Sequence, residues 1–180
     1  MHLVRHPLPR RDGHPAVKGH DDPGTGLRIV VAGIGSEYRR DDGAGPAVAA
    51  QVADLVGGVT DLGAIADPLD LLGLWDGADL AVVVDAVCSG AKPGTVRLVE
   101  LDNASAPEPV GDASRTTSTH GIGLTDVFRL AQAVGTAPGR VVVVGIEGTD
   151  FAQGTGLSPA VARSVPHATR QVVELIGDAR

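Results

Sequence analysis

Three residues that could bind a divalent metal ion stand far apart in the sequence, each next to a segment with a clear secondary-structure pattern. Asp42 precedes a helical segment, Asp85 ends an apolar run, and His120 stands before a second helical segment. Two carboxylates and an imidazole suit a divalent metal ion better than they suit a buried core. The sequence therefore predicts a metal site, provided that the fold brings the three residues together.

The segments around these residues alternate between strand and helix patterns. Apolar β-branched runs predict strands, and segments rich in Ala, Val and Leu at helical spacing predict helices. The expected strands are 27–33, 59–65, 80–85, 94–101 and 140–146, and the expected helices are 44–56, 68–75, 122–134 and about 166–176. We expect Pro166 to open the last helix, because a proline inside a helix would break it. The alternation predicts an α/β domain, a three-layer α/β/α sandwich with a mostly parallel sheet.

One connection between the expected strands is too short for a parallel crossover. Only residues 86–93 separate the strand that ends at Asp85 from the strand 94–101. A parallel crossover needs a dozen or more residues, so 94–101 should be an antiparallel edge strand. The polar loop 102–119 would then return the chain to the starting edge. This course places Asp42, Asp85 and His120 at the carboxyl ends of the parallel strands, where open α/β sheets bind ligands.

The composition limits the classes of protein and of partner. The chain has 180 residues, enough for one domain, which we place at 27–180 after a disordered tail at 1–26. The net charge of −7 and the aromatic content of 2% argue against a nucleic-acid partner. No apolar run approaches the length of a membrane span, so no membrane association is expected. A single cysteine, Cys88, excludes an internal disulfide, and we expect a cytoplasmic protein.

Other motifs leave alternatives open. Gly33-Ile34-Gly35 after a strand resembles the start of a dinucleotide motif, but Tyr38 stands where the third glycine belongs. These glycines more plausibly permit a tight strand exit and a close backbone approach. Cys88 as a nucleophile is a weak alternative, because small buried cysteines are common. The four histidines of the tail (His2, His6, His14 and His20) could collect metal, although a disordered extension explains them as well.

Each candidate metal ligand also has a structural alternative. Either Asp41 or Asp42 could cap the helix that follows. Asp85 could accept hydrogen bonds from the backbone N–H groups of residues 86–88, and His120 could simply precede a helix. The residue patterns alone do not decide between these interpretations.

Four blocks of sequence together resemble the nickel–iron hydrogenase maturation proteases. They are GIGSEYRRDDGAG (33–45), VVVDAVCSGAKPGTVRL (82–98), STHGIGLTDVFRL (118–130) and VVVGIEGTDFAQGTGLSPAV (142–161). The resemblance covers essentially all of 27–177, with the blocks in the family's order and spacing. It implies an α/β/α fold, in agreement with the layers expected from the strand and helix patterns.

The resemblance also implies an activity and a site. Members of this family are endopeptidases that remove a short C-terminal extension from the hydrogenase large-subunit precursor after nickel has been inserted. The residues matching the family's metal contacts are Asp42, Asp85 and His120. Nickel would arrive with the precursor, and three protein ligands would bind free nickel only weakly.

The chain departs from the family pattern at a few positions. Ser36 stands where the family usually has Asn, and ADPLDLL (66–72) replaces a glycine-rich stretch, which makes Ser36 and Asp67 candidate substrate contacts. Glu147 at the end of the last strand is a third candidate, with a solvent-facing charge as its alternative. The competing class is a module without catalysis that delivers nickel or binds a nucleotide.

Overall fold

The computed structural model of the protein describes residues 26–101 and 123–180. The expected tail at 1–26 lies almost wholly outside this part of the chain. So do the predicted loop 102–119 and His120, so these predictions remain predictions. No helix in the described residues is long and apolar enough to cross a membrane.

Five strands form a single mixed sheet with the order β2-β1-β3-β5-β4. Their bounds are β1 Ile29–Ile34, β2 Val59–Ile65, β3 Leu80–Val87, β4 Val96–Leu101 and β5 Arg140–Glu147. The pairs β1–β2, β1–β3 and β3–β5 are parallel, whereas β4 pairs with β5 antiparallel. The prediction of an antiparallel edge strand, made from the short 86–93 connection, is confirmed.

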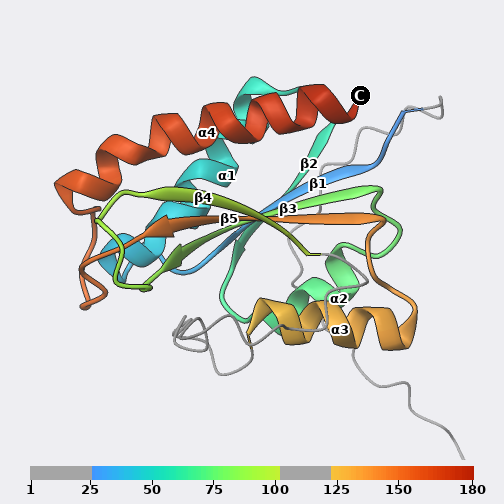
Figure 1. Cartoon of the computed structure of the whole chain (residues 1–180), viewed down its shortest axis with the longest axis horizontal. Coiled ribbons are helices and arrows are strands. Elements are labelled where there is room, and N and C mark those ends of the chain that lie inside the picture. The colour runs from blue at the N-terminus through green and yellow to red at the C-terminus, as the bar shows by residue number, and fades with distance from the viewer. Residues whose placement is uncertain (1–25, 102–122) are drawn as a thin grey trace, which may run out of the picture.

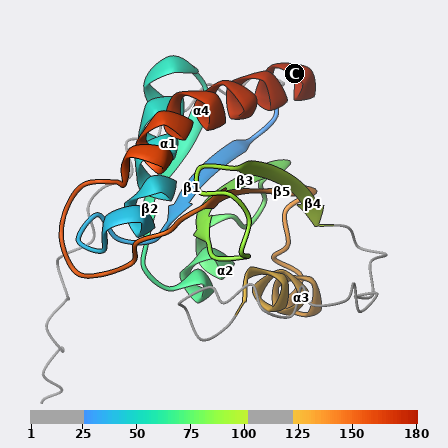
Figure 2. The same ribbon diagram turned by 60° about the vertical axis from the view of Figure 1, so that its left-hand side comes forward.

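Helices cover both faces of this sheet (Figures 1 and 2). The α-helices are α1 Ala44–Leu55, α2 Leu71–Leu74, α3 Leu124–Val134 and α4 Pro159–Ala179, and short 3-10 helices η1 Arg40–Gly43 and η2 Pro68–Asp70 precede α1 and α2. The pair α1 and α4 lies on one face, and the pair α2 and α3 lies on the other (Figure 1). This arrangement is the predicted three-layer sandwich.

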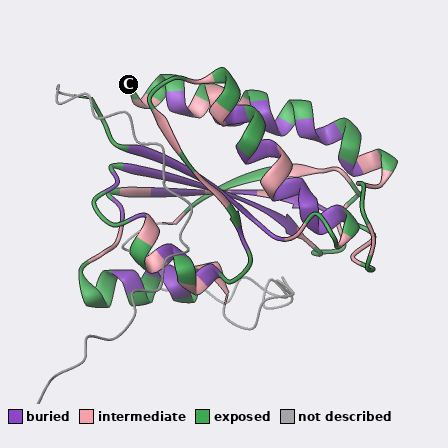
Figure 3. Cartoon of the chain, turned by 180° about the vertical axis from the view of Figure 1, so that it is seen from behind, coloured by how far each residue is buried: buried purple, intermediate pink, exposed green. Residues whose placement is uncertain are grey.

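Alternate residues of the central strands supply the two layers of core. In β1, Ile29 and Val31 pack with α1 and α4, while Val30, Ala32 and Ile34 pack with α2 and α3. A strand buried on both faces is apolar along its whole length, which explains the uninterrupted run at this position. Figure 3 shows the central strands buried almost throughout.

The last helix corrects one sequence-based prediction. Pro159 occupies the first turn of α4, and Pro166 lies inside the helix instead of opening it. Proline has no N–H, so the Ala162 carbonyl has no helical donor at Pro166. Both residues are exposed, and this carbonyl can be hydrated. Ser164 and Val165 on the opposite side remain buried against the core. The cost of the proline is therefore reduced by placing it on the solvent face.

The first turn of α1 lies directly on the ends of β1 and β3. A Cβ atom added at Gly45 would come within 2.5 Å of the carbonyl oxygens of Ile34 and Val84, and one at Gly33 would overlap Gly45 and Pro46. Only glycine permits so close a backbone approach. The expectation that Gly33 and Gly35 serve a close approach is met, because a Cβ at Gly35 would overlap the Asp42 carbonyl oxygen, and the partner is the chain itself.

Candidate functional site

Asp42 lies in η1, the single 3-10 turn between β1 and α1. Its side chain is 1% exposed, and its Oδ2 accepts a hydrogen bond from the Ser36 backbone N–H at 3.0 Å. The Arg39 guanidinium lies 3.9 Å from the same oxygen. Helix α1 begins after Gly43 with no side-chain cap. The alternative that one of the paired aspartates caps this helix is therefore wrong.

Asp85 occupies the next strand of the sheet, near the carboxyl end of β3, and is 7% exposed. Burial, and after it the negative charge of Asp42, raise the pKa of Asp85 to about 7, against a lowering effect of the Ala86 backbone hydrogen bond. The hydrogen bond to Ala86 fits the structural alternative in part. Turn η1, which carries Asp42, packs against β3, which carries Asp85, so the two carboxyls lie at the same rim, and the charge of Asp42 acts on the pKa of Asp85.

The third predicted ligand cannot be placed beside them, because His120 lies outside the described residues. Helix α3 begins after Gly123, three residues beyond His120. Among residues 26–101 and 123–180, no group of three or more His, Cys, Asp or Glu side chains is arranged to hold a metal ion. The structure thus brings together two of the three predicted ligands, and the metal site itself remains a prediction.

Asp41, the neighbour of Asp42, has a different environment, which the sequence did not indicate. It is fully buried and accepts hydrogen bonds from the N–H groups of Thr149 at 2.9 Å, Asp150 at 3.0 Å and Ser158 at 2.6 Å, and from the Ser158 hydroxyl at 2.9 Å. Burial alone would raise the pKa of Asp41, but these hydrogen bonds together lower it. Asp41 is an ionised anchor that ties η1 to the loop between β5 and α4.

Glu147 at the end of β5 anchors a second rim loop. It is 3% exposed, and its carboxylate accepts hydrogen bonds from the N–H groups of Ser89 and Gly90 at 2.8 and 2.9 Å and from the Ser89 hydroxyl at 2.6 Å. The alternative of a solvent-facing charge is wrong, because these donors lie over the carboxylate. Cys88, next to this loop, is exposed, so the expectation of a small buried cysteine is also wrong.

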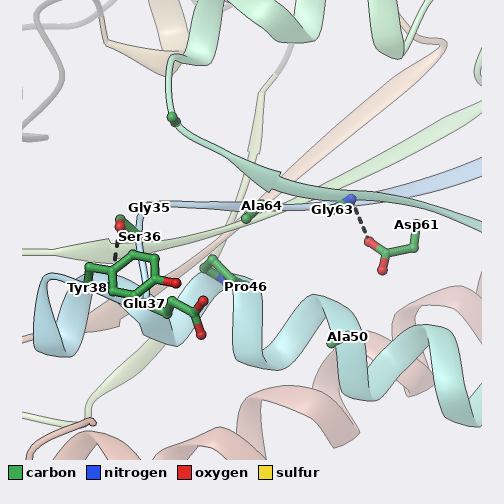
Figure 4. Close-up of a pocket in the computed structure, with 10 residues that line it drawn as sticks. Gly35, Ser36, Glu37, Tyr38, Pro46, Ala50, Asp61, Gly63 and Ala64 are labelled. Carbon is green, nitrogen blue, oxygen red and sulfur yellow. Dashed lines mark hydrogen bonds between the residues drawn. The ribbon is translucent and has the colours of Figure 1, made fainter. Parts of the chain in front are cut away.

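The other two candidate substrate contacts lie on the β2 side of the rim. Asp67 is exposed, and it caps η2 by accepting a hydrogen bond from the Leu69 N–H at 3.0 Å. Ser36 is half-buried, and its hydroxyl accepts a hydrogen bond from the Tyr38 N–H at 3.3 Å. Ser36 also lines a groove of about 440 Å³ between the β1–η1 turn, α1 and β2 (Figure 4). Through its backbone N–H, Ser36 joins this groove to Asp42.

Comparison with known proteins identifies the class to which this fold and its acidic rim belong. Residues 49–175 match the family model described as hydrogenase maturation protease. The chain is 31% identical over 150 residues to the hydrogenase expression/formation protein HupD of Rhodobacter capsulatus, covering 81% of this chain and 70% of the relative. It is 30% identical over 158 residues to HupD of Rhizobium leguminosarum bv. viciae, covering 86% and 76%. The chain belongs to the hydrogenase maturation protease family.

Solved structures agree on the fold. The hydrogenase maturating endopeptidase HybD from E. coli superposes with a TM-score of 0.70 at 24% identity, over 85% of this chain and 94% of that one. The maturation protease HybD from Thermococcus kodakarensis gives 0.63 at 24% identity, over 83% and 99%. The predicted fold is confirmed by these structures, and the predicted family, a protease family, is confirmed by the family model and the two relatives.

Proposed function

We propose that this protein removes the C-terminal extension of a hydrogenase large-subunit precursor, and that it recognises the nickel carried by that precursor through Asp42, Asp85 and His120. The observation that carries the proposal is the pair Asp42 and Asp85, buried together at the carboxyl ends of β1 and β3. Family membership supplies the class of reaction, and this pair supplies the place for it.

Two neighbouring buried carboxyls are unfavourable unless a cation or a proton compensates them. Burial, and after it the charge of Asp42, raise the pKa of Asp85, which agrees with such a cost. A divalent ion arriving with the substrate would offset both negative charges and displace any proton held by Asp85. The pair therefore suits a site that is completed only when the substrate binds.

The position of α3 is consistent with a role for His120. In Figure 1, helix α3 begins below the middle of the sheet, and its first turn is the end of the helix nearer to the side where the parallel strands finish. Gly123, which precedes this helix, follows His120 by three residues. Neutral imidazole and carboxylate are acceptable partners for Ni²⁺, and thiolates of the precursor would complete its coordination.

The substrate's nickel would position the peptide segment and polarise the carbonyl of the bond to be cleaved. Asp85 has a pKa of about 7 in the free protein, which also suits a general base for the attacking water. In either case Asp42 and Asp85 act on the substrate directly. We expect the reaction to take place in the cytoplasm.

The competing hypothesis is a protein that delivers nickel without cutting a peptide bond. The two hypotheses predict different behaviour of the isolated protein. A delivery protein binds free Ni²⁺ tightly, whereas a protease that senses nickel on its substrate binds the free ion weakly and releases a peptide.

The decisive experiment mixes the purified protein with nickel-loaded and nickel-free precursor and follows the mass of the precursor. We expect the extension to be lost only from the loaded precursor. The variants Asp42→Ala, Asp85→Ala and His120→Ala should each lower the cleavage rate by about a thousandfold or more. Full activity in all three would remove the proposed site, and no cleavage by the unmodified protein would remove the proposed function.

A further inference from the structure

The groove beside Asp42 has no role in the chemistry proposed so far. Its walls come from three elements: Glu37 and Tyr38 from the β1–η1 turn, Pro46 and Ala50 from α1, and the second half of β2 (Figure 4). The volume of about 440 Å³ falls within the range of ligand-binding clefts.

On the β2 side of the groove, the main chain at Gly63 has free space beside it in which the backbone of another polypeptide could lie. The register of β2 against β1 shifts between Val31 and Gly33, so β2 contains an irregularity opposite this point. Gly63 lies at this irregularity with φ +75°, and a Cβ added there would meet nothing within 4 Å. A glycine bulge on an outer strand, with free space above it, permits close approach of another polypeptide.

The charged side chains that line the groove are both acidic. Glu37 and Asp61 are exposed, and the lining contains no Lys, Arg or His. The two arginines nearest in sequence pair elsewhere, Arg39 with Asp42 and Arg40 with Asp150 at 3.3 Å. The groove therefore presents negative charge and an aromatic ring, Tyr38, which is 66% exposed. This combination favours a cationic side chain.

The groove continues directly from the proposed reaction site. The Ser36 N–H donates to Asp42, while the rest of Ser36 faces the groove. A polypeptide whose metal lies at Asp42 must leave the site along one of its walls, and this groove is an opening beside that carboxylate.

We propose that the groove is a specificity site that holds the precursor's polypeptide next to the cleaved bond and favours Lys or Arg side chains there, through Glu37 at one end of the groove and Asp61 at the other (Figure 4). The inference rests on the proposed function, because the occupant is the same precursor. The two carboxylates contribute to binding and do not take part in bond cleavage.

The test compares the double variant Glu37→Gln/Asp61→Asn with the unmodified protein on nickel-loaded precursor. Asp61 accepts a hydrogen bond from the Gly63 N–H at 2.8 Å, and the amide oxygen of Asn retains that acceptor, so the bulge should survive. We expect KM to rise about three- to tenfold with kcat nearly unchanged, because two exposed charge interactions are lost. The matched control is Glu174→Gln/Asp178→Asn, which removes equal charge from exposed positions on α4 and should leave KM unchanged.

A second precursor separates charge recognition from general damage. In this precursor the Lys and Arg residues flanking the cleaved bond are replaced by Gln, and the groove variant and the unmodified protein should then have the same KM. An unchanged KM on the original precursor, an equal loss on both precursors, or a fall confined to kcat would overturn the inference. These outcomes all require cleavage by the unmodified protein, so they are distinct from failure of the proposed function.

Discussion

Asp41 and Asp85 are both buried at the same rim of the sheet, yet their surroundings move their pKa values in opposite directions. Asp41 accepts four hydrogen bonds from the loop 149–158, and its pKa is lowered. For Asp85, one backbone hydrogen bond, from Ala86, lowers the pKa, but burial and the charge of Asp42 outweigh it and raise the pKa to about 7. Asp41 has four donors that offset its burial, whereas Asp85 has one and also lies near the charge of Asp42, so the two pKa values move in opposite directions.

This difference separates an anchoring role from a reactive one. A carboxylate satisfied by backbone donors is stable as an anion and has little further capacity to bind a ligand. A carboxyl that is costly to ionise gains more from an incoming cation. Glu147 likewise accepts three hydrogen bonds, from Ser89 and Gly90, and so resembles Asp41 in tying a rim loop to the sheet. Asp41 and Glu147 thus hold the rim loops, whereas Asp85, beside Asp42, is the carboxyl that burial makes costly to ionise, in line with the role proposed for the pair.

The largest expected effect that tests this comparison is the pH dependence of stability caused by Asp85. The unfolded chain loses this proton near its ordinary pKa of 3.8, and the folded chain retains it to about 7. Raising the pH through this window therefore destabilises the folded protein, and the full effect corresponds to about 4 kcal/mol. Urea unfolding of the metal-free protein and of Asp85→Asn between these pH values should show the difference in unfolding free energy changing by that amount.

The Asp42→Asn variant is the control for this measurement. Removing the Asp42 charge removes the second cause of the raised pKa, so the pH dependence should shrink but persist through burial. A difference between the unmodified protein and Asp85→Asn that stays constant with pH would contradict the assignment of Asp85 as the costly carboxyl.

The next largest effect should come from Asp41→Asn. The amide NH₂ group would face at least one of the N–H donors of Thr149, Asp150 and Ser158, and the compensated buried charge would be lost. We expect a loss of about 3 kcal/mol in unfolding free energy above pH 5. This loss should diminish in acid, because a lowered pKa stabilises the folded state only while the carboxylate is ionised. An Asp41→Asn protein as stable as the unmodified one would show that the anchor is unimportant.

The smallest effect is expected for Glu147→Gln. An amide oxygen can still accept from the N–H groups of Ser89 and Gly90, and the Ser89 hydroxyl can rotate to accept from the new NH₂ group. We expect a loss of about 1 kcal/mol, measured by urea unfolding. Cleavage of loaded precursor should remain within about threefold of the unmodified rate if Glu147 is an anchor. A loss as large as that of Asp85→Ala would instead support the prediction that Glu147 contacts substrate.

The fold could be predicted from the sequence because its signals are local. The apolar runs at β1, β3 and β5 mark strands buried on both faces, and the length of 86–93 fixes the direction of β4. The placement of Asp42 and Asp85 at one rim follows from the same connectivity. The prediction that Pro166 opens the last helix is wrong because a helix can contain a proline on its solvent face. Which positions face solvent depends on tertiary packing, which the local sequence does not show.

The roles of the anchoring carboxylates could not be predicted in this way. The donors to Asp41 lie 108 to 117 residues away in the sequence, and those to Glu147 lie 57 and 58 residues away. Asp41 and Asp42 are adjacent and chemically identical, so only the fold distinguishes them. His120 and its neighbours lie outside the described residues, and the third ligand is still predicted from sequence alone.

The contact of Gly33 and Gly45 has a consequence for the precision of the site. At this contact, main-chain atoms of α1 touch main-chain atoms of β1 and β3, and these contacts set the spacing between the helix and the sheet. Side-chain rotamers, which repack when core residues are exchanged, do not set it. Conservative changes among the valines of the core should therefore alter the melting temperature while leaving the separation of Asp42 and Asp85 as it was. A single added methyl group at either glycine would force the first turn of α1 away from the ends of β1 and β3.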